Sequence, residues 1–251
     1  TGTHTVGDAF RSIQYGDADV MVAGGSEATI CDVGVGAFSA ARTLSKRNDE
    51  PQRASRPYDK DRDGFVMAEG AGVLILEEYE HAKKRGAHIY AEIVGYGQTA
   101  DAYDIVAPAP DGQGAIHSMQ FALNDAGMKP SEVQYINTHG TSTGLGDKAE
   151  SHAVAEVFGD RKTNPDLFVT STKSMHGHML GATGAAEAIA CIKAINDNIV
   201  PPTINLDNQD EEVADLNYVP YKAVKAEVHA ALSNSFGFGG QNASLIFREV
   251  K

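Results

Sequence analysis

The segment from Gly184 to Asp197 constrains the fold more than any other part of the chain. Its sequence, "GAAEAIACIKAIND", predicts a helix that is rich in alanine and apolar on almost every side up to Ile195. A helix with one apolar stripe lies on a surface, whereas a helix that is apolar all round is buried between layers. The fold must therefore cover this helix on at least two sides.

Strand-like and helical patterns alternate along the rest of the chain. Apolar, β-branched runs predict buried strands, and apolar residues at helical spacing predict helices. The expected strands lie at 18–28, 70–76, 91–101, 133–140 and 167–174, the expected helices at 1–16, 77–86, 114–127 and 147–159, and a terminal hairpin at 229–250. This alternation predicts an α/β fold with a largely parallel central sheet.

Composition narrows the class of protein. The chain has 251 residues, of which 42% are hydrophobic, so it is long enough to bury a substantial core. The formal net charge of −13 argues against a nucleic-acid partner, because binding phosphates requires clustered cations. No apolar run approaches the roughly 20 residues that span a membrane, and no targeting signal is visible. Two distant cysteines, Cys31 and Cys191, fit a reducing compartment, so we expect a cytoplasmic protein.

One stretch of the chain is locally basic. The segment 41–56, "ARTLSKRNDEPQRASR", contains Arg42, Lys46 and Arg47 together with two further arginines. It fits a solvated loop, and it also fits a positive patch that steers an acidic partner towards an otherwise acidic protein.

Several familiar motifs are only partly present. The segment 59–70, "DKDRDGFVMAEG", matches a calcium-binding loop until its last position, where Gly70 replaces the required glutamate. The segment 95–100, "GYGQTA", has the glycine spacing of a dinucleotide site but no helix opens at its end. The chain contains neither a Walker loop nor a Gly-x-Ser-x-Gly elbow.

Three histidines lie beside glycines at predicted strand or helix ends. His139 ends the strand of "NTHGTSTGLGD", and His176 and His178 lie in "STKSMHGHMLGATG". A zinc site is one interpretation, but the nearby Lys173 and the lack of a neighbouring cysteine argue against it, so we expect no metal.

Acid–base and electrostatic chemistry explains these residues better. Neutral imidazoles of His139 and His178 that face one pocket would donate hydrogen bonds to an enolate or oxyanion. Lys173, held by Glu187, would add positive potential and keep both rings uncharged. In the turn "GFGGQN", glycines allow backbone N–H groups to approach a substrate oxygen, and Phe238 would form a pocket wall or gate. A plain hairpin turn is the alternative.

Five motifs together resemble a known family. They are "GDADVMVAGGSEA", "SRPYDKDRDGFVMAEGAG", "NTHGTSTGLGD", "STKSMHGHMLGATG" and "NSFGFGGQN". In this order they resemble the elongating β-ketoacyl-acyl-carrier-protein synthases of type II fatty-acid synthesis. The resemblance implies a thiolase-like, five-layered αβαβα fold made of two similar halves. Residues 1–90 would be the end of the first half, and residues 91–251 would be the complete second half.

The resemblance also implies a reaction and its partners. The reaction is a decarboxylative Claisen condensation of an acyl thioester with malonyl-acyl-carrier protein. The enzyme would be an acyltransferase and a homodimer that binds acyl-carrier protein. It would need no cofactor beyond the phosphopantetheine that carries its substrates.

Residue roles follow from the same resemblance. His139, His178, Lys173 and Phe238 would be catalytic, with Phe238 supplying an oxyanion-hole N–H and a gate. Glu187 and Phe236 would support them. Thr141 and Thr143 would contact phosphopantetheine, Arg42, Lys46 and Arg47 would dock the carrier protein, and 101–110 would be a second mobile loop.

Two departures from the family pattern stand out. Gly144 occupies a position where the family usually has proline, which would loosen the loop after Thr143. The nucleophilic cysteine of the family would lie two residues before Thr1, at the start of the first helix. There the helix dipole favours a thiolate. We therefore expect this chain to be inactive by itself.

Two other functions remain open. A non-catalytic chain-length-factor subunit of a polyketide system shares the fold but lacks the cysteine, and the presence of both histidines and Lys173 argues against it. A polyketide synthase condensing domain is the second alternative, which an adjoining acyltransferase region would reveal.

Overall fold

A computed structural model describes residues 1–250 of the chain. The elements are α1 (Gly2–Gln14), β1 (Val20–Glu27), α2 (Asp32–Ala40), η1 (Pro51–Arg53), β2 (Gly70–Glu77), α3 (Tyr79–Lys84), β3 (Glu92–Ala100), α4 (Gln113–Ala126), η2 (Pro130–Glu132), β4 (Tyr135–Asn137), α5 (Gly144–Phe158), β5 (Phe168–Thr170), α6 (Lys173–His176), η3 (Leu180–Ala182), α7 (Thr183–Asp197), β6 (Ile199–Val200), β7 (Val224–Lys225), β8 (Ala230–Phe236) and β9 (Gln241–Arg248). None of these helices is long and apolar enough to cross a membrane.

The central sheet has five strands in the order β3-β9-β8-β4-β5. Strand β4 pairs in parallel with both β5 and β8, whereas β8 with β9 and β9 with β3 are antiparallel. The expectation of a largely parallel sheet is therefore wrong. The physical reason is the short turn between β8 and β9, because a tight hairpin connection can join only antiparallel strands.

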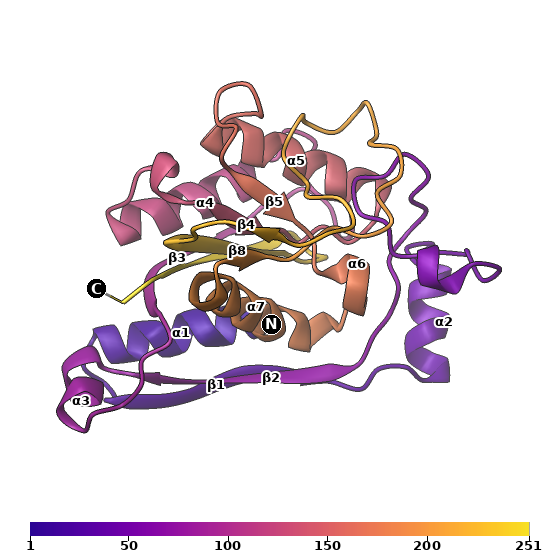
Figure 1. Cartoon of the computed structure of the whole chain (residues 1–251). Helices are drawn as coiled ribbons and strands as arrows, with labels where there is room; N and C mark the ends of the chain where they lie inside the picture. Colours follow the sequence, from indigo (N-terminus) through magenta and orange to yellow (C-terminus); the bar gives the residue numbers. More distant parts are fainter. Residues whose placement is uncertain (251) are drawn as a thin grey trace.

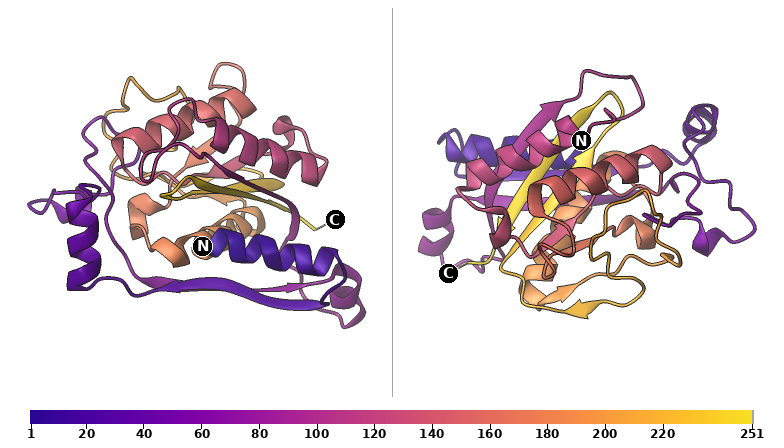
Figure 2. Two further views of the ribbon diagram at one scale, coloured as in Figure 1. Left: turned by 180° about the vertical axis from the view of Figure 1, so that it is seen from behind. Right: turned by 90° about the horizontal axis from the view of Figure 1, so that it is seen from above.

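The elements stack in layers around this sheet. Helices α4 and α5 cover one face, and α1 and α7 cover the other (Figures 1 and 2). The two-stranded ribbon of β1 and β2 lies beyond α1 and α7 as a further layer (Figure 1). Helix α7 is thus enclosed between sheet and ribbon, as its apolar sequence predicts.

Helices α1 and α7 touch through their backbones. A Cβ atom on Gly184 would lie 2.4 Å from the backbone nitrogen of Thr3 and 2.1 Å from its hydroxyl oxygen. A Cβ on Gly2 would lie 2.7 Å from the nitrogen of Ala185. No side chain fits at these distances, so glycine is required at both positions for the helices to pack this closely.

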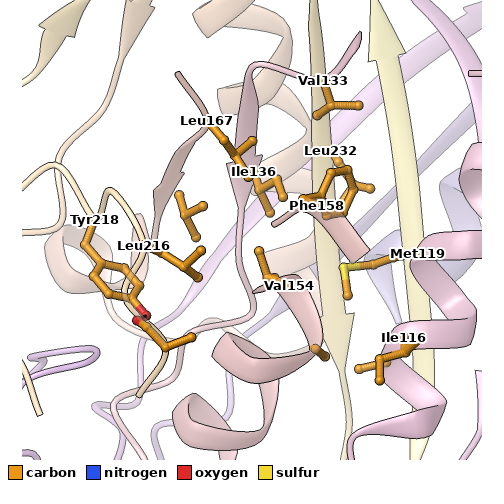
Figure 3. Packing of buried hydrophobic residues seen from close by; sticks show 14 of the residues in the cluster. Ile116, Met119, Val133, Ile136, Val154, Phe158, Leu167, Leu216, Tyr218 and Leu232 are labelled. Atoms are coloured by element: carbon orange, nitrogen blue, oxygen red, sulfur yellow. Dashed lines mark hydrogen bonds between the residues drawn. The ribbon is translucent and has the colours of Figure 1, made fainter. Parts of the chain in front are cut away.

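The larger hydrophobic core lies between the sheet and the helices α4 and α5. Figure 3 shows Met119 from α4 and Phe158 from α5 converging with Ile136 and Leu232 from the sheet. All four side chains are buried. This core fixes α5 against the end of β4, where the first predicted catalytic histidine is located.

The ribbon differs from its expectation as a pair of buried strands. One of its faces packs against α1 and α7, but Val22 and Ile75, which are opposite each other in the register, are 69% and 63% exposed. The two strands were predicted correctly. The prediction that they are buried was wrong, because no element of the described residues covers the outer face of the ribbon.

Residues 42–69 form a long segment, here called the crossing segment, between α2 and β2. It carries the motif that resembles a calcium loop, and Asp59 of that motif is buried. Its carboxylate is 3.0 Å from the guanidinium of Arg56 and accepts the backbone N–H groups of Asp207 and Asn208 at 2.9 and 2.8 Å. These bonds attach the crossing segment to the loop before β7.

Gly144 provides a test of how α5 begins. It is the first residue of the helix, its added Cβ would meet nothing within 4 Å, and Thr143 has φ −99° and ψ 145°, which suits a residue before proline. We expect Gly144→Pro to raise the free energy of unfolding by about 0.4–1 kcal/mol, because it restricts the unfolded chain. Urea denaturation measures this change.

Gly127 is the matched control for that substitution. It ends α4 with φ +62° and donates its N–H to the carbonyl of Asn124. Proline cannot adopt this φ and has no N–H, so Gly127→Pro should destabilise the protein. A loss of stability in Gly144→Pro as well would contradict our account of the helix start.

Candidate active site

His139 is positioned by a carboxylate from the neighbouring helix. It follows β4, and its backbone N–H and that of Gly140 donate to the two oxygens of Glu150 at 2.8 and 2.7 Å. Glu150 belongs to α5 and is buried, and burial raises the pKa of its carboxyl to about 7. Glu150 could not be predicted from the sequence, because one glutamate in a helix carries no signal of burial.

His178 is held by the crossing segment. Its N–H donates to the carbonyl of Val66 at 2.8 Å, and its carbonyl accepts the N–H of Ala68 at 2.9 Å. The ring of Phe65 packs edge-on against the imidazole with 5.3 Å between ring centroids. The two histidines are therefore supported by different parts of the chain.

The neighbours of His178 decide which ring nitrogen carries its proton. The backbone N–H of Leu180 approaches Nδ1 at 3.3 Å, and the hydroxyl of Thr183 lies 3.0 Å from the same atom. A backbone N–H is only a donor, so Nδ1 must accept. The neutral imidazole of His178 therefore carries its proton on Nε2 and presents an N–H donor there.

The two imidazole rings meet. Their centroids are 5.3 Å apart and their planes are nearly perpendicular, at 86°. The pKa of both His139 and His178 lies well below the ordinary value for histidine. Burial is the main cause, and the positive charge of Lys173 is the second. Both rings are therefore neutral near pH 7, as the sequence analysis expected.

His176 does not join this pair. Its Nδ1 lies 2.8 Å from the carbonyl of Gly177, so the ring is occupied by the local backbone. Within residues 1–250, no group of three or more His, Cys, Asp or Glu side chains is arranged to hold a metal ion.

Lys173 and Glu187 form a buried ion pair. Lys173 begins α6 and Glu187 lies in α7, with 2.5 Å between Nζ and Oε1. Their side chains are only 1% and 0% exposed. Burial raises the pKa of Glu187 to about 7, and the adjacent ammonium group opposes this rise. The pair that the sequence analysis proposed is therefore present.

A cavity of about 320 Å³ opens beside His139. Thr141 and Thr143 lie in its wall, and their hydroxyl oxygens are 3.0 Å apart. His178 and Lys173 are not among the residues that line this cavity, and His178 adjoins it through the contact of its ring with that of His139.

Phe236 and Phe238 form another part of this cavity wall. Phe236 lies 6.2 Å from the ring of His139, whereas Phe238 lies 6.4 Å from the ring of Phe38 and is 44% exposed. The turn that carries Phe238 contacts the loop 101–110, because the Gly239 N–H donates to the carbonyl of Ile105 at 3.0 Å.

The three predicted docking cations do not form one cluster on the cavity wall. Arg42 lines the cavity. Lys46 is exposed, and Arg47 is 3.6 Å from Glu50 and donates to the carbonyl of Asp61 at 3.0 Å. Arg42 is therefore the cation best placed at the mouth of the site.

The chain resembles known sequences along almost its whole length. Residues 1–82 match the profile for the β-ketoacyl synthase N-terminal domain, and residues 90–207 match the profile for the C-terminal domain. The chain is 53% identical over 251 residues to the 3-oxoacyl-[acyl-carrier-protein] synthase 2 of Vibrio cholerae, and 55% identical over 249 residues to that of Rhizobium meliloti. It covers 60% and 58% of the lengths of these two relatives.

Solved structures have the same fold. A β-ketoacyl synthase from Burkholderia phymatum matches all of this chain with a TM-score of 0.94 at 43% identity, over 59% of its own length. A type II polyketide ketosynthase, solved in complex with its acyl-carrier protein and bound to the hexaketide, matches with a TM-score of 0.96 at 42% identity, over 61% of its length. The chain belongs to the β-ketoacyl synthase family and has the thiolase-like fold of its ketosynthases.

The protonation of the two histidines is directly testable. We expect ¹⁵N NMR to show both rings neutral between about pH 8 and pH 6, with His178 protonated on Nε2. Lys173→Met should raise the pKa of both rings, because it removes a nearby positive charge. Lys193→Met, a loss of an exposed lysine from α7, should leave both unchanged. Titration of either ring near its ordinary pKa would refute the argument.

Proposed function

We propose that this chain forms part of an acyltransferase that catalyses the decarboxylative Claisen condensation of an acyl thioester with malonyl-acyl-carrier protein in fatty-acid elongation. The observation that carries the proposal is the contact of two neutral imidazoles, one of which presents an Nε2–H donor. Identity of 53% and 55% to two proteins named 3-oxoacyl-[acyl-carrier-protein] synthase 2 supports it.

The geometry suggests how the reaction proceeds. In the malonyl thioester, the bond between the α-carbon and the carboxylate breaks, carbon dioxide leaves, and the electron pair passes to the thioester oxygen. Hydrogen bonds from neutral His139 and His178 stabilise this enolate oxygen, because preorganised donors in a water-poor site act where charge develops. The enolate carbon then attacks the acyl thioester carbonyl, and the thiolate leaves.

The remaining expected contacts belong to this proposal. Thr141 and Thr143 bind the phosphopantetheine arm along the cavity, and Phe238 gates it. The N–H of Phe238 serves as a further oxyanion donor. Arg42, with Lys46 and Arg47, attracts an acidic carrier protein. The complete enzyme is a cytoplasmic homodimer that uses no cofactor beyond carrier-bound phosphopantetheine.

A polyketide ketosynthase is the second candidate. Its support is the TM-score of 0.96 to the ketosynthase bound to a hexaketide. The identity to that chain is 42%, against 52–55% for three 3-oxoacyl-[acyl-carrier-protein] synthase 2 relatives over nearly the same residues, so we favour fatty-acid elongation. Product analysis separates the two, because only a polyketide enzyme extends an unreduced β-keto chain.

Removal of either histidine tests the catalytic proposal. In the complete enzyme, His139→Ala or His178→Ala should lower the rate of malonyl decarboxylation by about 10²–10³-fold, since each change removes one donor to the enolate oxygen. Release of labelled carbon dioxide measures this rate. His152→Ala, which changes an exposed histidine of α5, is the control. A nearly normal rate in either catalytic variant would contradict the proposal.

The two cysteines of this chain should not carry the acyl group. Cys191 is fully buried in α7, and burial strongly raises the pKa of its thiol, which leaves it inert. Cys31 is exposed beside α2 and does not line the cavity. After incubation with radiolabelled acyl-carrier protein, we expect no label on the chain. Retained label that disappears in Cys31→Ser or Cys191→Ser would show that the assignment is wrong.

A further inference from the structure

Three consecutive residues of the crossing segment lie between two parts of the proposed binding site. On one side is the docking segment, defined as residues 42–47. On the other is the phosphopantetheine loop, defined as residues 141–144. Arg62 and Gly64 bond to the phosphopantetheine loop, and Asp63 bonds to the docking segment. None of the three was predicted to be functional from the sequence.

Arg62 holds the phosphopantetheine loop from behind. Its Nε donates to the carbonyl of Thr143 at 3.1 Å, and one terminal nitrogen donates to the carbonyl of Gly144 at 2.8 Å. The other terminal nitrogen donates to the carbonyl of Asp59 at 2.9 Å and to the carboxylate of Asp210 at 2.6 Å. The side chain is only 4% exposed. A planar guanidinium with fixed donors is suited to orienting several acceptors at once.

Asp63 holds the docking segment. One carboxylate oxygen accepts the hydroxyl of Ser45 at 2.5 Å, and the other accepts the backbone N–H of Lys46 at 2.8 Å. Hydrogen bonds to an ionised carboxylate are stronger than bonds between neutral groups. Asp63 therefore fixes the docking segment at Ser45 and at the backbone of the exposed Lys46.

Gly64 brings these two attachments close together. Its N–H donates to the carbonyl of Ser142 at 3.0 Å. Its φ is +140°, and an added Cβ would lie 2.5 Å from the carbonyl carbon of Leu44. The docking segment and the phosphopantetheine loop are therefore packed against the same backbone position, where only glycine fits.

We propose that Arg62 and Asp63 are positioning residues that keep the docking segment in register with the phosphopantetheine loop. Arg62 acts through the loop that contacts the arm, and Asp63 acts through the surface that contacts the carrier protein. The inference rests on the proposed function, because it assumes that an acidic carrier protein delivers its arm to this cavity. On this proposal, binding of the phosphopantetheine arm and binding of the carrier-protein surface depend on different residues.

Binding experiments with two ligands separate these roles. Malonyl-pantetheine reports the arm alone, whereas malonyl-acyl-carrier protein reports the arm and the docking surface. Asp63 also lines the cavity, at its edge beside the docking segment. Asp63→Asn should therefore raise the dissociation constant for the carrier protein about tenfold, as expected for weakening a charge-assisted hydrogen bond, and raise that for malonyl-pantetheine by much less. Arg62→Lys should raise both by about five- to tenfold, because an ammonium group cannot hold two carbonyls in the same geometry.

Matched variants exclude a general effect of charge or folding. Asp61→Asn changes an exposed aspartate two residues from Asp63 by the same charge and should change neither constant. Gly144→Pro should partly restore malonyl-pantetheine binding in Arg62→Lys, because proline at the helix start stiffens the same loop. Methyl NMR of labelled Thr141 and Thr143 reports the loop in the free chain and shows that each variant is folded.

The outcomes are distinct. If the unmodified chain and the complete enzyme bind neither ligand, the proposed function fails and this inference fails with it. If they bind both, and Asp63→Asn weakens both ligands equally or Arg62→Lys weakens neither, the function stands and the positioning role is wrong. A loss in Arg62→Lys that Gly144→Pro leaves untouched would show that Arg62 does not act through the loop.

Discussion

The buried pair of Lys173 and Glu187 places a charged group beside both imidazoles of the site. Two charges removed from water are costly unless they are paired, and their separation of 2.5 Å satisfies that condition. The ammonium group then acts on both imidazoles and lowers the pKa of each, in addition to the effect of burial. Neutral rings are needed for the proposed chemistry, because each must donate a hydrogen bond without protonating the enolate that it stabilises.

The ion pair is also linked to the amino-acid sequence of α7. The side of α7 that faces the sheet and the ribbon is shielded from water, and Glu187 is the acidic residue on that side. Small residues, chiefly alanine and glycine, at most of the other buried positions let neighbouring backbones approach, as the contact of Gly184 with Thr3 shows. The feature that most constrains the fold therefore also carries a member of the site.

Much of this arrangement could be predicted from the sequence. Helix and strand patterns located most elements correctly, and histidines beside glycines at element ends indicated His139 and His178. Resemblance to a family supplied roles that spacing alone could not. The sheet direction and the exposure of Val22 and Ile75 were predicted wrongly, because both depend on which elements pair and cover one another.

Other contributors were missed for a shared physical reason. Glu150, Arg62 and Asp63 are charged residues in a helix or a polar loop, where the usual expectation is exposure to water. Glu150 and Arg62 are instead buried, and each of the three residues bonds to backbone groups of a neighbouring segment. Nothing in the local sequence distinguishes a solvated carboxylate from one that accepts two N–H groups. Only the packing of distant segments does so.

The distance between the rings of His139 and His178 is consequently a property of tertiary packing. His139 is attached through Glu150 to α5, whereas His178 is attached to Val66 and Ala68 of the crossing segment. Gly177 permits the second attachment, since its φ is +72° and an added Cβ would lie 3.0 Å from the carbonyl oxygen of Val66. The crossing segment therefore holds the backbone of His178 directly, whereas His139 is held chiefly through Glu150. Within the crossing segment, residues 56–64 are fixed by buried ion pairs and by hydrogen bonds to the phosphopantetheine loop and to the loop before β7. These bonds hold the backbone that positions His178.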